Sequence, residues 1–289
     1  MAEGDFTGNF DGGVAVITGA GSGLGAALAQ RFAAEGMRVA ALDINADHAG
    51  RTADAVRASG VDALSTRVDV ADPSSLADAA REVAATFGAC NVLCANVGVQ
   101  QFGALDVLTA EDWQWVLSVN VLGTVQTVNA FLPLLRASSG RRHIVLTSSV
   151  AALAPTPRQG AYVVSKFAVT GYGDVLRQEL ASEGIGVTIV FPAGMITTHL
   201  ESSRAARPAA LGESVLRDED IEVVVATAAP QPEDVLAPED AIGHLLPDLL
   251  ANRPYVITHG SAGAAVDERH RELGAAFRRM NAARRPISD

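Results

Sequence analysis

The hydrophobic residues of this chain fall into short runs that alternate with longer amphipathic stretches. The short runs are rich in valine, isoleucine and alanine, which is typical of strands buried on both faces. The runs predicted as strands are Val14–Thr18, Met37–Leu42, Ala63–Val68, Asn91–Ala95, Arg142–Thr147, Val187–Phe191 and, near the C-terminus, Tyr255–Thr258.

Helical periodicity fills the intervals between these strands. The predicted helices are Ala26–Glu35, Ala46–Ser59, Pro73–Phe87, Glu111–Arg136, Gln159–Glu183 and Pro238–Asn252. Strands and helices that alternate in this way form a parallel sheet with right-handed crossovers. The sequence therefore predicts an α/β protein, a single-domain Rossmann fold with a doubly wound parallel sheet of about seven strands and helices on both faces.

Three segments lie outside this repeating pattern. Residues 1–12 form a polar N-terminal extension, and residues 262–289 form a charged tail with a helical pattern over Asp267–Arg285. Between residues 195 and 237 the periodicity breaks down, which predicts a loop-rich insertion that acts as a substrate lid. The tail is placed either to dock on another subunit or to fray.

Composition narrows the classes of function. The chain of 289 residues has 22 basic and 33 acidic side chains and a net charge of −11, which disfavours nucleic-acid and anionic-membrane partners. No apolar run reaches the roughly 18 residues that span a bilayer, and the polar N-terminus does not resemble a signal peptide. Cys90 and Cys94 lack partner His or Cys residues and predict buried side chains, with no metal site. A cytoplasmic location is expected.

The single lysine of the chain, Lys166, lies four residues after Tyr162. On a helix these two side chains share a face, about 5–6 Å apart at Cβ. A nearby cation favours the phenolate and is expected to lower the tyrosine pKa, so that Tyr162 exchanges protons near neutral pH. The pair predicts general acid–base catalysis, and the alternative is a solvated lysine beside a core tyrosine.

A glycine-rich turn joins the first predicted strand to the first predicted helix. It contains Gly19, Gly21, Ser22, Gly23, Leu24 and Gly25. Glycines let the backbone approach a ligand, and the N-terminus of the following helix offers free N–H groups to a phosphate. A turn of this kind between a strand and a helix predicts a dinucleotide site, whereas alone it would indicate only a flexible loop.

Asp43 ends the second strand, about 20 residues after the glycines, where an acidic side chain binds the adenosine ribose of a dinucleotide. Its charge would repel a 2′-phosphate, and Ile44 and Asn45 follow it in place of a basic residue. NAD is therefore favoured over NADP. The alternative role of Asp43, a helix N-cap, is compatible with this one.

Further residues follow the ends of other predicted strands: Asp69, Asn96, Ser149 and Pro192. In doubly wound folds, ligands bind at the edge where the carboxyl ends of the parallel strands meet. We therefore expect these residues, the glycine turn and Asp43 to converge on one site.

These motifs together resemble those of the short-chain dehydrogenase/reductase family, from Val14 to about Gly260. The matching segments are the T-G-x-x-x-G-x-G turn at Thr18–Gly25, the N-A-G element as Asn96-Val97-Gly98, the helix asparagine Asn120, the serine Ser149 thirteen residues before the tyrosine, the Y-x-x-x-K pair Tyr162 and Lys166, and the P-G-x-x-x-T segment at Pro192–Thr197. Ala193 replaces the first glycine of the last segment, which leaves the local backbone path open.

The resemblance implies a role for each matched residue. Tyr162 would exchange the hydroxyl proton of the substrate, Lys166 would lower the tyrosine pKa and hold the nicotinamide ribose, and Ser149 would polarise the substrate oxygen. Asn120, at a break in its helix, would hold a water that links Lys166 to solvent. The other implied cofactor contacts are Ile44, Asp69, Val70, Asn96, Val97, Gly98, Pro192, Gly194, Met195 and Thr197.

The implied function is an NAD-dependent oxidoreductase that interconverts a secondary alcohol and a ketone on a hydrophobic, aromatic or alicyclic substrate. Expected substrate contacts are Gln100, Val150 and His199. The alternatives are an NADPH-preferring carbonyl reductase of a biosynthetic pathway and a dinucleotide-binding regulator without catalysis, which the complete tetrad disfavours. The family also implies a homo-oligomer, a tetramer or dimer, formed through Glu111–Arg136 and Gln159–Glu183.

Overall fold

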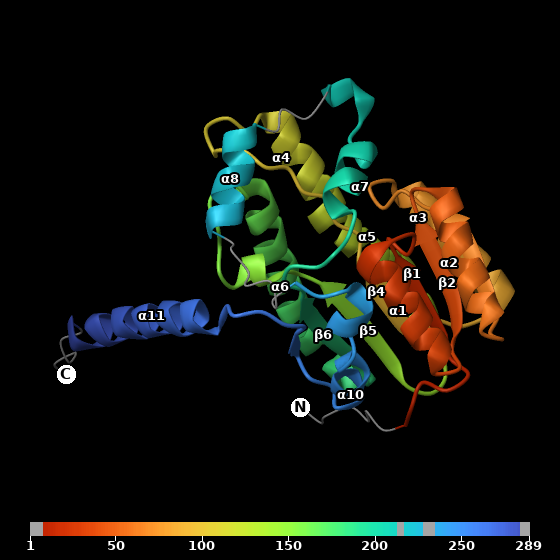
Figure 1. The fold of residues 1–289 in the computed structure, drawn as a ribbon. Helices are drawn as coiled ribbons and strands as arrows, with labels where there is room; N and C mark the ends of the chain where they lie inside the picture. Colours follow the sequence, from red (N-terminus) through yellow and green to blue (C-terminus); the bar gives the residue numbers. More distant parts are fainter. Residues whose placement is uncertain (1–7, 213–216, 228–234, 284–289) are drawn as a thin grey trace.

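The computed structural model describes residues 8–212, 217–227 and 235–283. Seven strands form one parallel sheet in the order β3-β2-β1-β4-β5-β6-β7 (Figure 1). Their bounds are β1 Val14–Thr18, β2 Arg38–Asp43, β3 Ala63–Arg67, β4 Val92–Ala95, β5 Arg142–Thr147, β6 Ile185–Phe191 and β7 Tyr255–Ile257. The predicted α/β fold and its sheet are confirmed.

The first strand, β1, lies inside the sheet, and later strands are added on both sides of it. β1 pairs with β2 on one side and with β4 on the other, and every pairing along the sheet is parallel. The strand order therefore reverses between β1 and β4. In doubly wound sheets a ligand binds at the carboxyl ends of the strands on either side of such a reversal. The glycine turn follows β1 at this point.

Helices cover both faces of the sheet. Those up to the sixth strand are α1 Gly23–Ala34, α2 Ala46–Ala58, α3 Pro73–Phe87, α4 Ala110–Leu117, α5 Gly123–Ala137 and α6 Gly160–Leu180. Those after it are α7 His199–Ala206, α8 Asp218–Thr227, α9 Pro238–Ala241, α10 Leu245–Leu250 and α11 Gly263–Ala283. Short 3-10 turns lie at Val150–Ala152, Ala181–Glu183 and Ala209–Leu211.

Two hydrophobic layers hold these helices to the sheet. Side chains alternate along a strand, so Ile17 of β1 packs in one layer with Phe32 of α1, while Val16 packs in the other layer with Phe131 of α5. Cys90 and Cys94 are free and fully buried, as predicted. Removal of these side chains from water is the main force that fixes the strand ends in place.

The predicted helix Glu111–Arg136 is interrupted in its middle. A π-helical segment, Ser118–Leu122, joins α4 to α5. Segments of this kind insert one extra residue into a helical turn and occur frequently at functional sites. The segment places the side chain of Asn120 in the interior, with no exposed surface. The break that was expected at Asn120 is therefore present.

The same stretch, Ala110–Ala137, is apolar enough and long enough to cross a bilayer, and it is the one such helix among the described residues. No run of that kind was expected from the sequence. In the fold, α5 packs on α3, β4 and β5. This packing accounts for part of the apolar character, since 44% of the apolar window is buried.

The segment 195–237 contains more regular structure than the sequence predicted. Its described part folds largely into α7 and α8, whereas residues 213–216 and 228–234 lie outside the described residues. Among the side chains that the structure describes, the one buried in each of these helices is polar, Ser203 in α7 and Asp220 in α8. Helices that bury a polar residue give no apolar periodicity, and for this reason the pattern indicated a loop.

The C-terminal part also differs from the prediction. The helix expected over Pro238–Asn252 is divided into α9 and α10, separated by residues 242–244. The helical tail is present as α11, which projects away from the body of the protein (Figure 1). The predicted extension and tail lie partly outside the described residues, at 1–7 and at 284–289.

Candidate active site

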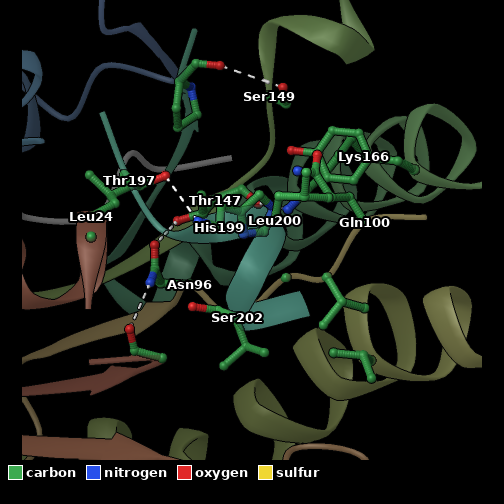
Figure 2. Close-up of a pocket in the computed structure, with 18 of the residues that line it drawn as sticks. Leu24, Asn96, Gln100, Thr147, Ser149, Lys166, Thr197, His199, Leu200 and Ser202 are labelled. Carbon is green, nitrogen blue, oxygen red and sulfur yellow. Dashed lines mark hydrogen bonds between the residues drawn. The ribbon is translucent and has the colours of Figure 1, made fainter. Parts of the chain in front are cut away.

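A cavity of about 1110 Å³ opens along the carboxyl edge of the sheet. Its walls come from the glycine turn, from the segments that follow β2 to β6, and from α4, α6 and α7. Figure 2 shows Leu24, Asn96, Ser149, Lys166 and His199 among the lining residues. The predicted site residues line this cavity except for Gly21 and Asn120. The expected convergence of strand ends is thus found in the structure.

The glycine turn and α1 approach each other so closely that a side chain would not fit between them. A Cβ at Gly25 would lie 2.0 Å from the carbonyl oxygen of Gly19, and Gly19 itself has a φ of +67°. Ser22 precedes α1 without a capping side-chain hydrogen bond, and the first turn of α1 has no acidic residue. The first N–H groups of α1 are therefore available to an anion, which fits the pyrophosphate of a dinucleotide.

Asp43 is held at the end of β2 by two backbone N–H groups. Gly21 N–H donates to Oδ2 and Asn45 N–H donates to Oδ1, both at 2.9 Å. A Cβ at Gly21 would lie 2.8 Å from Asp43 Oδ2 and 2.6 Å from Cβ of His48. Gly21, predicted as a cofactor contact, thus positions the carboxylate that faces the cavity.

Asp69 and Val70 follow the neighbouring strand β3. The N–H of Ala71 donates to Asp69 Oδ1 at 2.9 Å, which fixes the carboxylate in a tight turn. Val70 is buried, and a Cβ at Gly123 would lie 2.7 Å from its Cγ2. The start of α5 therefore needs a glycine to leave room for Val70. Ile44 adds an exposed apolar side chain at the end of β2.

Asn96 ties together the ends of three strands. Its Nδ2 donates to the carbonyl oxygen of Thr18 at 3.2 Å. Figure 2 shows its other bond, in which Oδ1 accepts from Thr147 Oγ1 at 3.0 Å. The carbonyl oxygen of Thr147 in turn accepts from Nζ of Lys166 at 2.9 Å. Thr147 therefore links the sheet to the catalytic candidate on α6. The sequence pattern did not identify this threonine, because its partners are distant in the chain.

Tyr162 and Lys166 lie on successive turns of α6, as their spacing predicted. Nζ of Lys166 lies 5.5 Å from the centroid of the Tyr162 ring. Lys166 is only 3% exposed, and this burial lowers its pKa from 10.5 to about 8. An ammonium with this pKa can exchange its proton with water at moderately alkaline pH, which an arginine cannot do.

The expected effect of Lys166 on Tyr162 is not found. Burial raises the pKa of Tyr162, and a hydrogen bond with the Ser149 side chain opposes this shift. The Lys166 ammonium lies over the ring and donates to Thr147, so burial has the larger effect on the phenol. Ser149 also accepts from the N–H of Ala151 at 3.1 Å, which fixes its hydroxyl beside Tyr162.

Asn120 lies behind the cavity wall and its amide is fully engaged. Its Oδ1 accepts from the N–H of Val99 at 2.8 Å, and its Nδ2 donates to the carbonyl of Val99 and to Ser165 Oγ, each at 2.9 Å. These bonds join the π-helical segment to α6 beneath Lys166. A Cβ at Gly98 would lie 3.1 Å from Lys166 Nζ, so this glycine leaves room for the ammonium. The water link through Asn120 stays a prediction.

Gln100, Val150 and His199, the expected substrate contacts, all line the cavity. The His199 ring lies 6.3 Å from the Tyr162 ring. Burial and the charge of Lys166 lower the pKa of His199 from 6.5 to about 4, so this side chain is neutral at physiological pH. Residues at the same cavity that the sequence did not single out include Trp115, Thr156 and Gln159. The Thr156 hydroxyl is buried and has no hydrogen-bond partner among the residues that the structure describes.

Two ion pairs hold the described part of the lid to the body. Arg207, at the end of α7, lies 2.7 Å from Asp112 of α4, and its guanidinium lies 5.3 Å from the Trp115 ring. Arg158, before α6, lies 3.4 Å from the buried carboxylate of Asp220 in α8. Because these pairs join residues that are far apart in the chain, no local sequence motif predicts them.

Ala193, which replaces a family glycine, is accommodated by a glycine elsewhere. A Cβ at Gly260 would lie 3.0 Å from Cβ of Ala193, and Gly260 has a φ of +102°. The side chains of Thr258 and His259 continue the contact: Thr258 Oγ1 accepts from the N–H of Ala193 at 3.4 Å, and His259 Nε2 contacts the carbonyl of Gly194 at 2.6 Å. The Pro192–Thr197 segment thus keeps its place at the cavity.

Comparison with known proteins agrees with this geometry. The family model for short chain dehydrogenases matches residues 13–208. D-threitol dehydrogenase of Mycolicibacterium smegmatis is 36% identical over 194 residues, which cover 67% of this chain and 74% of that protein. The C alpha-dehydrogenase of a Sphingobium strain is 33% identical over 202 residues, which cover 70% of this chain and 66% of that protein.

Solved structures extend the likeness over the whole fold. A short-chain dehydrogenase/reductase from Burkholderia phymatum, in complex with NAD, has a TM-score of 0.84 and 31% identity, and the match covers 98% of this chain and 99% of that one. A short chain dehydrogenase from Mycobacterium paratuberculosis, bound to NAD, has a TM-score of 0.74 and 27% identity, with coverage of 88% and 99%. This chain belongs to the short-chain dehydrogenase/reductase family.

Proposed function

We propose that this protein is an NAD-dependent oxidoreductase that interconverts a secondary alcohol and a ketone. The observation that carries the proposal is the single cavity shared by the glycine turn, Asp43 and the Ser149–Tyr162–Lys166 group. A dinucleotide site and a proton-transferring group in one cavity are what hydride transfer to a carbonyl requires. The dehydrogenases among its relatives support this class of reaction.

NAD is the proposed cofactor, and when bound it supplies or accepts the hydride. The N-terminus of α1 would hold the pyrophosphate, and Asp43 would hold the adenosine ribose. The Asp43 carboxylate disfavours a 2′-phosphate, and neither the turn nor Ile44 provides a cation to bind one. The NAD complexes of the Burkholderia and Mycobacterium structures support the same choice.

In the proposed reduction, Tyr162 donates its hydroxyl proton to the carbonyl oxygen while the carbonyl carbon receives a hydride. The raised pKa of Tyr162 keeps the phenol protonated at neutral pH, which suits this direction. Ser149 donates a hydrogen bond to the same oxygen, where negative charge develops. Lys166, with a pKa of about 8, is placed to return a proton toward Tyr162, and in oxidation the proton moves in reverse.

The proposed substrate is a secondary alcohol or ketone with hydrophobic bulk, aromatic or alicyclic. The part of the cavity proposed to hold the substrate has an apolar lining, which includes Val150, Ala154 and Trp115. His199 is neutral there and can accept or donate one hydrogen bond to a polar group of the substrate. The described part of the lid, with α7 at the cavity, would cover it.

We also propose a cytoplasmic, single-domain enzyme that acts on a small molecule and assembles into a dimer or tetramer. The net charge of −11 supports the absence of nucleic-acid and membrane partners. α4, α5 and α6 are the proposed oligomer helices. The exposed side chains of Leu122, in the π-helical segment between α4 and α5, and of Val164 and Val175, on α6, support this assignment.

The test is nicotinamide absorbance with aliphatic, alicyclic and benzylic secondary alcohols and the matching ketones, each with NAD and with NADP. Tyr162→Phe is expected to lower kcat about 10²–10⁴-fold, while NADH binding, measured by fluorescence, is retained. Turnover that survives this change would refute the assigned acid–base role. Tighter binding of NADPH than NADH would instead support a biosynthetic carbonyl reductase.

A further inference from the structure

The C-terminal helix α11 stands apart from the rest of the fold. Its 21 residues, Gly263–Ala283, extend about 31 Å at 1.5 Å per residue, and the helix points away from the sheet (Figure 1). None of its side chains that the structure describes is buried. Its contact with the body lies near its first turns, where the Arg269 guanidinium lies 4.7 Å from the centroid of the Phe167 ring of α6.

One side of α11 is apolar. At 100° per residue, Val266, Leu273, Phe277 and Met280 lie within about 60° of one another around the helix axis. Leu273, Phe277 and Met280 are 51%, 64% and 45% exposed. The opposite side carries charged residues: Glu268, Arg271, Glu272 and Arg279. This division is that of a helix that packs on a surface.

The exposed apolar face needs an explanation outside this chain. Contiguous apolar patches with polar rims are typical of interaction sites in soluble proteins. A helix without tertiary contacts is also only marginally stable in water, because its stability comes mostly from packing of the apolar face. Nothing in the described part of the chain covers the three exposed side chains Leu273, Phe277 and Met280.

The charge on the outer half of the tail indicates what covers it. Residues 273–285 include Arg278, Arg279, Arg284 and Arg285 and no acidic side chain. These arginines contribute +4 to a chain whose net charge is −11, so the remainder carries −15. A body of opposite net charge is therefore available on every other copy of the same chain.

We propose that α11 is an exchange arm that packs its apolar face on the body of a second copy of this chain. The apolar side chains provide the contact area, and the exposed Arg278 and Arg279 pair with the acidic body of the partner. In a twofold arrangement each subunit gives one arm and receives one, so the contact is made twice. This interface is additional to the proposed contact through α4, α5 and α6.

The root of the arm connects this contact to the candidate active site. Gly260, Ser261 and Ala262, which immediately precede α11, line the cavity. His259, one residue earlier, contacts the carbonyl of Gly194 at 2.6 Å. An arm held by a partner would therefore hold one wall of the cavity, and we expect faster hydrogen exchange at residues 260–262 when the arm is released.

The experiment compares two double variants of the full chain by light scattering over a range of protein concentrations. Leu273→Glu with Phe277→Glu adds two charges to the apolar face, and Ala264→Glu with Ala282→Glu adds the same two charges on the opposite face. All four positions are exposed, so neither variant disturbs the core. We expect the apolar-face variant to lose half of the wild-type assembly mass and the control to keep all of it. A monomeric wild type, or equal masses for all three proteins, would overturn the proposal.

Two further measurements test whether the partner of α11 is a second copy of this chain. Arg278→Glu with Arg279→Glu should weaken self-association at least tenfold at low salt and much less at high salt, since the pairing charges are screened. No change at low salt would contradict the pairing with an acidic body. Co-sedimentation of the wild type with phosphatidylserine vesicles, without self-association through α11, would replace the second copy with a lipid surface and overturn the proposal.

Discussion

The guanidinium of Arg207 lies 2.7 Å from the carboxylate of Asp112, and the two side chains are only 8% and 10% exposed. Arg207 also donates to the carbonyl of Gly212 at 2.9 Å and lies against the Trp115 ring at the cavity. One buried pair thus fixes the end of α7, the start of α4 and a cavity-lining aromatic residue. A buried charge that loses its partner is costly because it is desolvated without compensation.

We expect Arg207→Ala to lower the free energy of unfolding by about 3–5 kcal/mol, because it leaves the buried carboxylate of Asp112 without its counter-charge, although the N–H of Thr109 still donates to Oδ2. Urea denaturation measures this change. The matched control is Arg204→Ala, an exposed arginine on the same helix, with an expected change within about 0.5 kcal/mol. Equal changes in the free energy of unfolding at the two positions would show that the pair with Asp112 does not contribute to stability as predicted.

Gly25→Ala is expected to disrupt the dinucleotide site, because its Cβ would meet the carbonyl oxygen of Gly19 at 2.0 Å. NADH binding should weaken at least tenfold, or about 1.4 kcal/mol. The control is Gly50→Ala in α2, where a Cβ meets nothing within 4 Å and the change should stabilise the helix by about 0.5–1 kcal/mol. Fluorescence titration with NADH separates the two, and unchanged affinity in Gly25→Ala would contradict the role of this turn.

His199 should make the stability of the protein depend on pH between 4 and 6.5. Its folded-state pKa of about 4 lies below the ordinary 6.5, so the folded protein binds fewer protons than the unfolded chain in this window. The stability associated with neutral His199 is therefore present above pH 6.5 and is lost as the pH falls toward 4, by up to about 1.4 kcal/mol per pH unit.

Urea unfolding of wild type and His199→Asn at several pH values measures this dependence. The stability of the wild type relative to the variant should decline as the pH falls below 6.5, while the contributions of other groups cancel in the comparison. If the difference in free energy of unfolding between the two proteins is constant from pH 7 to pH 4.5, His199 is solvated in the folded protein and the prediction is wrong.

Asp43→Asn is expected to reduce the preference for NAD over NADP. Loss of the negative charge removes repulsion of the 2′-phosphate, and the amide binds the ribose hydroxyls less well. We expect the ratio of the two Kd values to shift by about 10–100-fold, or about 1.4–2.8 kcal/mol. Asp47→Asn, an exposed carboxylate four residues later, is the control and should leave the ratio unchanged. A shift of the same size in both variants would indicate a general effect of net charge.

Local pattern was sufficient for the sheet, the glycine turn and the spacing of the α6 pair. β1, its turn and α1 are consecutive, and Tyr162 and Lys166 share one helix, so their relative placement follows from backbone geometry alone. The break at Asn120 was expected only from the family resemblance. The helices of the lid were missed because their buried residues, Ser203 and Asp220, are polar.

The sequence by itself determined the α/β architecture, the polar residues that follow the strands and their convergence on one edge of the sheet. The tertiary structure alone decided the Arg207–Asp112 pair, the link from Asn96 through Thr147 to Lys166, and the direction of the Tyr162 pKa. The physical reason is that periodicity and motif spacing act over a few residues, whereas burial and ion pairing depend on side chains contributed by several distant elements.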